Sequence, residues 1–177
     1  MTQLSQSVRL DFEDDIAIIR VDNPPVNALS FHVRQGLLDG VTEAEKSDAT
    51  AIVLICEGRT FIAGADITEF SGKPQPPSLQ EAQDAMENCS KPVIAAVHGT
   101  ALGGGLEVAL CAHYRVGVTS SQYGLPEVKL GLLPGAGGTQ RLPRITGAAK
   151  ALQMMTSGDP IMEEEASMLF ARYIDVQ

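Results

Sequence analysis

The chain has 177 residues, of which 44% are hydrophobic and 20% charged, and its formal net charge at pH 7 is −9. This length and composition are typical of one soluble domain with a substantial core. The negative charge argues against binding to nucleic acid or to anionic membranes. The sequence contains no basic leader and no apolar stretch of membrane length, so we expect a cytoplasmic protein.

The cysteines are odd in number and scattered, at positions 56, 89 and 111. Cys56 and Cys111 lie in apolar runs, which favours buried free thiols in a reducing compartment. Cys89 follows a helix-like stretch, but no pattern of histidine and acid supports a nucleophile there. The histidines lack metal-ligand spacing, so we predict no metal site.

The first predicted elements are the two strands of a hairpin, residues 8–12 and 16–21. The segment 23–29 cannot continue a strand, because its two prolines remove backbone donors. Ser30 is a good N-cap for an amphipathic helix that begins directly after it. Residues 51–56 are all apolar, which predicts a strand buried on both faces of its sheet.

Residues 57–67 lead out of that strand through small side chains, where a ligand could meet bare backbone. An ordinary loop is the plain alternative for this stretch. Ser78 is expected to cap a helix that runs to about residue 88. The apolar residues 92–97 then predict another buried strand.

A glycine turn follows this strand, with the sequence His98-Gly99-Thr100-Ala101-Leu102-Gly103-Gly104-Gly105-Leu106-Glu107. Consecutive glycines allow unusual backbone angles and let a ligand approach bare amides at the start of the next helix. A phosphate loop is excluded because no Gly-Lys-Ser/Thr follows, and the spacing fails the dinucleotide fingerprint. The third interpretation is an oxyanion hole, which requires a second amide and an acid or base nearby.

Two glutamates are the candidate acids and bases. Glu107 lies in the first turn of the apolar helix, where it could simply complement the helix dipole. Glu127 is isolated between apolar residues, so it either pairs with Lys129 or Arg141 or is desolvated with a raised pKa. His98 precedes the turn and is expected to be a hydrogen-bonded structural residue at a strand end.

The last third of the chain predicts a strand at 114–118, a helix that opens at Gly138, and further helices over 148–156 and 160–171. The acidic run 163–165 is most simply a solvated helical face that the dipole favours. A metal site there is improbable because no histidine lies beside it.

The alternation of strands and helices predicts the α/β fold class. Two strand–turn–helix units, residues 51–88 and 93–112, look alike in plan. This similarity is compatible with a spiral or layered arrangement of repeated ββα units.

Several segments together resemble the crotonase family, which comprises the enoyl-CoA hydratases and isomerases. Phe61-Ile62-Ala63-Gly64-Ala65-Asp66-Ile67 is similar to the family's first oxyanion segment. Residues 98–107 resemble its glycine turn and first glutamate, residues 123–127 its second glutamate segment, and residues 131–142 the stretch after it. The segment 23–29 looks most like the hydratase/isomerase part of multifunctional β-oxidation enzymes.

This resemblance implies a crotonase-like spiral over residues 1–177 that lacks the family's usual C-terminal helical segment. It implies that the amides of Ala63 and Gly104 hold a thioester oxygen, and that Glu107 and Glu127 are the catalytic acids. By position, the residues expected to bind the CoA thioester are Val26, Ala28, Ala63, Ala65, Asp66, Ile67, Leu102 and Gly104.

The implied activity is enoyl-CoA hydratase, the syn addition of water to trans-2-enoyl-CoA to give 3-hydroxyacyl-CoA in fatty-acid β-oxidation. An isomerase needs only one base, so the presence of both glutamates favours the hydratase. The alternatives are Δ3,Δ2-enoyl-CoA isomerase activity in a multifunctional enzyme and an inactive CoA-thioester-binding fragment. No cofactor is expected, since coenzyme A belongs to the substrate. The expected assembly is a trimer, a hexamer or part of a multifunctional chain.

Overall fold

The computed structural model describes residues 1–72 and 75–170, and within them the main sheet has six strands, ordered β1-β2-β3-β4-β5-β7. The strands are β1 (Thr2–Gln3), β2 (Val8–Glu13), β3 (Ile16–Val21), β4 (Ala51–Cys56), β5 (Val93–Val97) and β7 (Tyr114–Gly117). The first three pair antiparallel, and β3, β4, β5 and β7 run parallel. The predicted hairpin and the longer predicted strands are confirmed.

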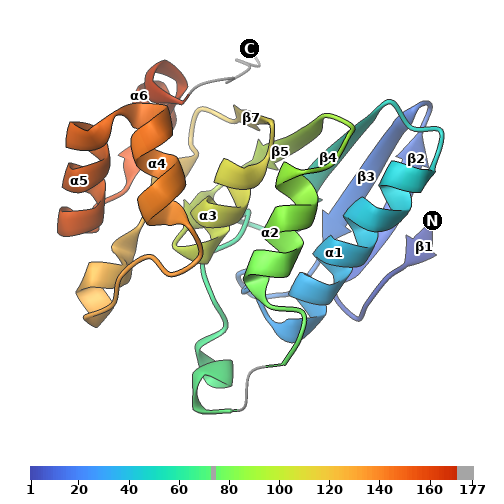
Figure 1. The fold of residues 1–177 in the computed structure, drawn as a ribbon, viewed down its shortest axis with the longest axis horizontal. Helices are drawn as coiled ribbons and strands as arrows, with labels where there is room; N and C mark the ends of the chain where they lie inside the picture. Colours follow the sequence, from blue (N-terminus) through green and yellow to red (C-terminus); the bar gives the residue numbers. More distant parts are fainter. Residues whose placement is uncertain (73–74, 171–177) are drawn as a thin grey trace.

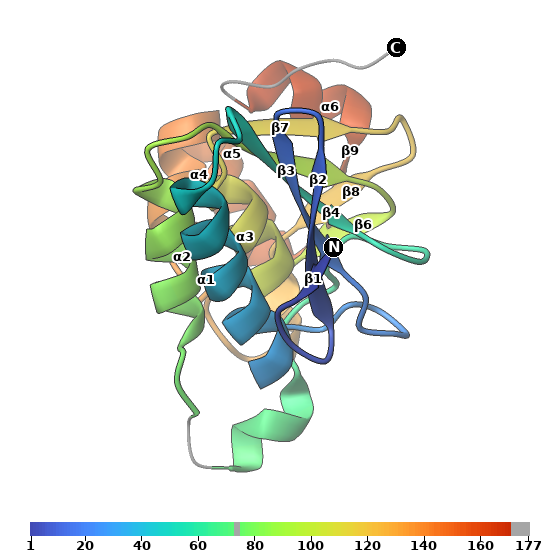
Figure 2. The same cartoon turned by 90° about the vertical axis from the view of Figure 1, so that its right-hand side faces the viewer.

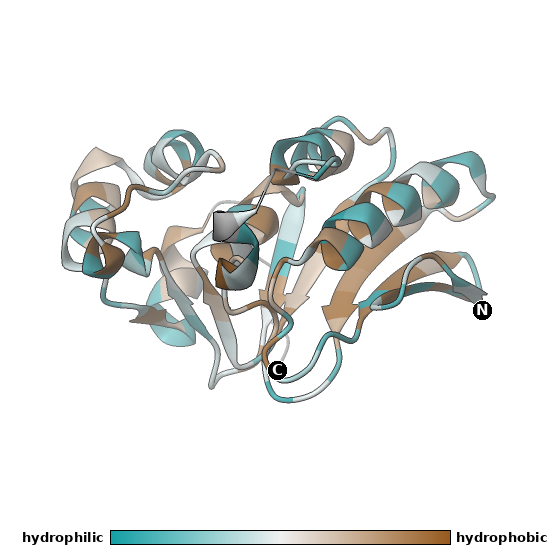
Figure 3. Ribbon diagram, turned by 90° about the horizontal axis from the view of Figure 1, so that it is seen from below, coloured by the Kyte–Doolittle hydropathy of each residue, from teal (hydrophilic) through white to brown (hydrophobic). Residues whose placement is uncertain are grey.

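Helices pack on one face of this sheet, as the edge-on view in Figure 2 shows. They are α1 (Phe31–Lys46), α2 (Leu79–Glu87) and α3 (Gly104–Cys111). In Figure 3 the strands are mostly apolar, whereas the helices alternate between polar and apolar sides. The core therefore lies between the sheet and these helices. No helix within the described residues is long and apolar enough to cross a membrane.

The prediction that β4 is buried on both faces is wrong. Alternate residues Ile52, Leu54 and Cys56 are buried, whereas the residues between them are only half-buried. The physical reason is that the covering helices lie on one side of the sheet, so alternate side chains meet different surroundings.

The starts of α1 and α2 are capped in different ways. Ser30 occupies the N-cap position of α1, but its hydroxyl makes no capping hydrogen bond. Glu69 instead accepts a hydrogen bond from the Phe31 amide, at 2.6 Å. At α2, Ser78 is the N-cap as expected, and it forms a capping box with Glu81, whose Oε2 accepts from the Ser78 amide at 2.7 Å.

A smaller sheet lies beside the main one and comprises β6 (Thr100–Leu102), β8 (Gln122–Gly124) and β9 (Ile161–Met162). The 3₁₀-helix η2 (Pro126–Leu130) follows β8. At the far end of the molecule from β1 lie α4 (Gly138–Thr146), α5 (Ala148–Ser157) and α6 (Glu163–Leu169), as Figure 1 shows. The short helix η1 (Ile67–Ser71) projects below the other helices in the same view.

The predicted repeat of strand–turn–helix units is present. After β4, Ile62 forms an isolated β-bridge with Ala101 of β6. Each unit therefore has a long strand, a short strand-like segment and a helix, first β4 with α2 and then β5 with α3.

The last predicted helix begins later than expected, and its acidic run is solvated only in part, since Glu164 is exposed and Glu163 is not. Residues 161–162 pair with β8, so α6 begins at Glu163. Glu163 is buried, and the Tyr123 hydroxyl donates to its Oε2 at 2.6 Å. The predicted end of this helix, Ala171, lies outside the described residues.

Candidate active site

The glycine turn joins β6 to α3 and packs tightly on the segment after β4. Gly103 has a positive φ of 53°, which residues with a side chain rarely adopt. A Cβ on Gly105 would lie 2.0 Å from the carbonyl oxygen of Ile62. The amide of Gly104 is the first of α3, so it has no acceptor within its own helix. A Cβ on Gly104 would lie 3.9 Å from the nitrogen of Ala65.

The structure favours Ala65 over Ala63 as the second amide. The Ala63 amide donates to the Val26 carbonyl at 3.1 Å, which conflicts with its predicted role on a thioester oxygen. An N–H that is already bonded within the protein is not available to a ligand. Ala65 is exposed, and its amide makes no hydrogen bond within residues 1–72 and 75–170.

Two backbone amides hold the carboxylate of Glu107 in place. Its side chain is only 2% exposed, and its Oε1 accepts hydrogen bonds from the amides of Ala136 and Gly138, both at 2.8 Å. Gly137, between them, has a left-handed φ of 92°, which allows the two amides to converge. The carboxylate thus has a fixed orientation and does more than complement the helix dipole.

Glu127 lies in η2 and is half-buried. Burial raises the pKa of its carboxyl, and the charge of Glu107 acts in the same direction. Its Oε2 is buried and has no hydrogen-bond partner within the described part of the chain. The surface-pair alternative is wrong, because Lys129 pairs with Asp159 at 2.8 Å and Arg141 pairs with a carboxylate of α2.

The carboxylates and amides meet at the glycine turn. A Cβ on Gly103 would lie 3.2 Å from Oε1 of Glu127. The next residue, Gly104, faces the nitrogen of Ala65, while Glu107 lies one turn further along α3. Two backbone donors and two carboxyl groups therefore surround one stretch of bare backbone.

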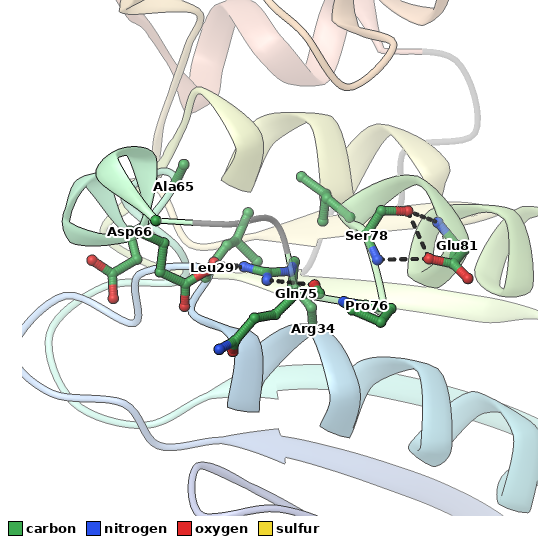
Figure 4. Close-up of a pocket in the computed structure, with 11 residues that line it drawn as sticks. Leu29, Arg34, Ala65, Asp66, Gln75, Pro76, Ser78 and Glu81 are labelled. Atoms are coloured by element: carbon green, nitrogen blue, oxygen red, sulfur yellow. Dashed lines mark hydrogen bonds and ion pairs between the residues drawn. The ribbon is translucent and has the colours of Figure 1, made fainter.

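A cavity of about 840 Å³ opens beside this turn, and Figure 4 shows its lining. Its walls come from the loop before α1, from η1 and from the start of α2. Of the predicted binding residues, Ala65 and Asp66 line it. Leu29 and Leu79 also line it, and both lie within 3.4 Å of a Cβ built on Gly104. The cavity thus reaches the glycine turn.

The other predicted binding residues surround the site without lining this cavity. The carbonyls of Val26 and Ala28 accept hydrogen bonds within the protein. Ile67, at the start of η1, is 69% exposed. Leu102 is half-buried, and its side chain lies 3.2 Å from a Cβ built on Gly124 of β8.

Sequence reasoning missed three charged residues in the cavity wall, Arg34, Glu69 and Glu81. Arg34 donates to Oε2 of Glu69 at 2.7 Å, to the Leu29 carbonyl at 2.9 Å and to the Pro77 carbonyl at 3.0 Å. It thereby joins α1, η1 and the chain before α2. No local pattern could have indicated this, because Glu69 and Pro77 are far from Arg34 in the sequence.

The surroundings of His98 and Cys89, two further residues considered from the sequence, favour structural roles. His98 follows β5, and its Nε2 lies 3.1 Å from the Gly58 carbonyl oxygen, as expected for a hydrogen-bonded residue at a strand end. Cys89 is buried and free, and burial raises the pKa of its thiol. A raised pKa disfavours the thiolate that a nucleophile requires.

An α/β core with paired amides, a glycine turn and two converging carboxyls defines a protein suited to stabilising an oxyanion and moving protons beside it. Residues 11–169 match the sequence profile of the family described as enoyl-CoA hydratase/isomerase. The chain therefore belongs to this family, the crotonases.

Individual relatives agree with this assignment. The chain is 47% identical over 155 residues to the peroxisomal bifunctional enzyme of Danio rerio, covering 87% of this chain and 22% of that protein. It is 42% identical over 168 residues to the probable enoyl-CoA hydratase of Bacillus subtilis strain 168, covering 90% of this chain and 65% of that protein. The chain spans less than two thirds of the length of these curated relatives.

Solved structures show the same fold. The enoyl-CoA hydratase from Thermoplasma volcanium GSS1 superposes with a TM-score of 0.88 at 31% identity, covering 98% of this chain and 72% of that one. The chain thus has the crotonase fold, and the expected α/β class with repeated ββα units is confirmed.

Proposed function

We propose that this chain hydrates trans-2-enoyl-CoA to 3-hydroxyacyl-CoA in fatty-acid β-oxidation. The observation that carries the proposal is the meeting of Glu107 and Glu127 at a turn where Gly104 lies beside the nitrogen of Ala65. Membership of the family supports the reaction class. Relatives named as a probable enoyl-CoA hydratase and as fatty-acid β-oxidation multifunctional proteins support the substrate class.

The amides of Ala65 and Gly104 are proposed to bind the thioester oxygen. Addition of water to Cβ moves negative charge onto this oxygen, which becomes an enolate. Fixed N–H donors stabilise that charge without reorganising, and each is worth about 3–4 kcal/mol in comparable sites. The amino-terminal end of α3 adds a favourable dipole.

Glu107 is proposed to take a proton from the attacking water. Its Oε1 is already occupied by the amides of Ala136 and Gly138, which leaves the second oxygen for water. A fixed carboxylate loses little entropy when it orients a reactant, and general-base help of this kind is worth about 10²–10⁴ in rate.

Glu127 is proposed to supply the proton to Cα. Burial and the charge of Glu107 raise the pKa of its carboxyl, so the protonated form persists to higher pH than for an exposed glutamate. Two carboxyls in different surroundings can then divide the roles of base and acid.

The cavity lined by Ala65 and Asp66 is the proposed site of the CoA thioester. Contacts from Val26, Ala28, Ile67 and Leu102 remain part of the proposal. Coenzyme A enters as part of the substrate, and the proposed chemistry uses no separate cofactor. Self-association or inclusion in a multifunctional chain, and a cytoplasmic location, are likewise proposed.

Hydration of crotonyl-CoA, followed by loss of the conjugated thioester's ultraviolet absorbance, tests the proposal. Glu107→Gln and Glu127→Gln should each lower kcat about 10²–10⁴-fold, because each removes one proton-transfer group. Wild-type rates in both variants would contradict the assignment. Isomerisation of a 3-enoyl-CoA should be assayed in parallel, since a reaction that needs one base should survive better in Glu107→Gln.

A further inference from the structure

One residue, Ala136, connects Glu107 to a charged pair on the helices outside the site. Its amide donates to Oε1 of Glu107 at 2.8 Å. Its carbonyl accepts a hydrogen bond from Nη1 of Arg141 at 3.1 Å. The loop that fixes the Glu107 carboxylate is therefore itself held by an arginine of α4.

Arg141 is in turn fixed by Glu87 of α2. Its Nη2 lies 2.7 Å from Oε2 of Glu87, and its Nε lies 3.3 Å from Oε1. A planar guanidinium that meets both oxygens of a carboxylate is restricted in orientation as well as position. The Arg141 side chain is only 13% exposed, whereas that of Glu87 is 48% exposed.

The loop leaves space for this guanidinium. A Cβ on Gly137 would lie 2.0 Å from Nη1 of Arg141. The same glycine has the left-handed φ that turns the flanking amides toward Glu107. The absence of a side chain at position 137 thus serves both contacts.

We propose that the Glu87–Arg141 pair is a positioning device for Glu107. It holds the Ala136 carbonyl, and so keeps the amides of Ala136 and Gly138 directed at the carboxylate that is to activate water. The effect on catalysis rests on the proposed role of Glu107, but the effect on the loop does not.

Hydrogen exchange of single amides tests the loop directly. Arg141→Gln and Glu87→Gln should speed exchange at Ala136 and Gly138 about tenfold or more. Arg144→Gln is the matched control, because among the described residues the Arg144 side chain bonds only to Gln140 of its own helix. It should leave both amides unchanged. Unchanged exchange in Arg141→Gln and in Glu87→Gln would overturn the proposal whether or not the chain is active.

Kinetics then test the link to Glu107. Arg141→Gln should lower kcat for crotonyl-CoA about 10–100-fold with KM within about twofold, and Glu87→Gln should have a smaller effect in the same direction. In a Glu107→Gln background, Arg141→Gln should cost almost nothing further, because the group that it positions is gone. Equal losses in both backgrounds would assign Arg141 a merely structural role.

The two proposals fail in different ways. If Glu107→Gln hydrates at the wild-type rate, the proposed function of Glu107 is wrong, and only the exchange result bears on the loop. If Glu107→Gln is inactive while Arg141→Gln and Glu87→Gln keep wild-type kcat, the positioning role is wrong and the proposed function stands. Thermal unfolding of each variant identifies any loss that reflects misfolding.

Discussion

At the scale of single residues, Glu127 combines a cost in stability with a proposed role in chemistry. Burial and Glu107 raise the pKa of its carboxyl. Such a group contributes stability that is fully present below its unfolded pKa and is lost as pH rises through its folded pKa. Ionised Glu127 therefore weakens the fold near neutral pH. The proposed role of Glu127 as proton donor at Cα depends on the same raised pKa.

Glu127→Gln should consequently unfold at a higher temperature than the wild type at pH 7. The neutral amide removes the cost of ionising a half-buried group, and the difference should shrink toward zero as pH falls to about 4, where the wild-type carboxyl is also neutral. Thermal unfolding at several pH values measures this. Glu164→Gln, at an exposed position, is the control and should change nothing. Destabilisation by Glu127→Gln at pH 7 would contradict the argument.

The sequence alone indicated the two glutamates of the proposed site but not Ala65 as its second amide. Glu107 and Glu127 lie within motifs whose residue types and spacing can be read directly. The choice between Ala63 and Ala65 depends on which amide donates a hydrogen bond to the Val26 carbonyl. That hydrogen bond joins segments far apart in the chain. Pairings of this kind are set by the tertiary fold.

At the scale of elements, Arg34 and Glu69 fasten η1 to the start of α1. Glu69 accepts from the Phe31 amide through Oε1 and from Arg34 through Oε2. One carboxylate thus acts as the N-terminal cap of α1 and as an ion-pair partner in the wall of the proposed CoA cavity.

Glu69→Ala should therefore raise KM for crotonyl-CoA several-fold while leaving kcat within about twofold. The substitution removes the contacts of Glu69 with Arg34 and the Phe31 amide that hold the cavity wall, and it leaves Glu107 and Glu127 unchanged. Loss of the cap should also cost about 0.5–2 kcal/mol of stability. Steady-state kinetics and urea unfolding measure the two effects. Glu43→Ala, which removes an exposed pair with Lys46 on the same helix, is the control. A fall in kcat with unchanged KM would contradict this role.

Elements of four or more residues were mostly predictable, because hydrophobic periodicity needs that length to be visible. The strands β6, β8 and β9 have two or three residues each, so they have no period to detect. The start of α6 was misplaced for the same reason, since Ile161 pairs with β8 only in the folded chain.

At the scale of the whole molecule, net charge and exposed apolar surface have opposite effects on self-association. The formal charge of −9 favours separation of copies in solution. Around η2, however, Leu130 and Leu133 are 69% and 82% exposed, and Val128 and Leu132 beside them are also exposed. Neighbouring exposed apolar side chains on this scale favour association.

Self-association should therefore increase with salt. Raising ionic strength from about 0.01 M to 0.5 M shortens the Debye length from about 30 Å to under 10 Å, which removes the repulsion but not the apolar attraction. Sedimentation velocity at fixed protein concentration should show a larger oligomer fraction at high salt. The double variant Leu130→Glu and Leu133→Glu should stay monomeric, whereas Phe12→Glu, at an exposed position on β2, should behave as wild type. A monomer at every salt concentration would contradict both this argument and the proposed homo-oligomer.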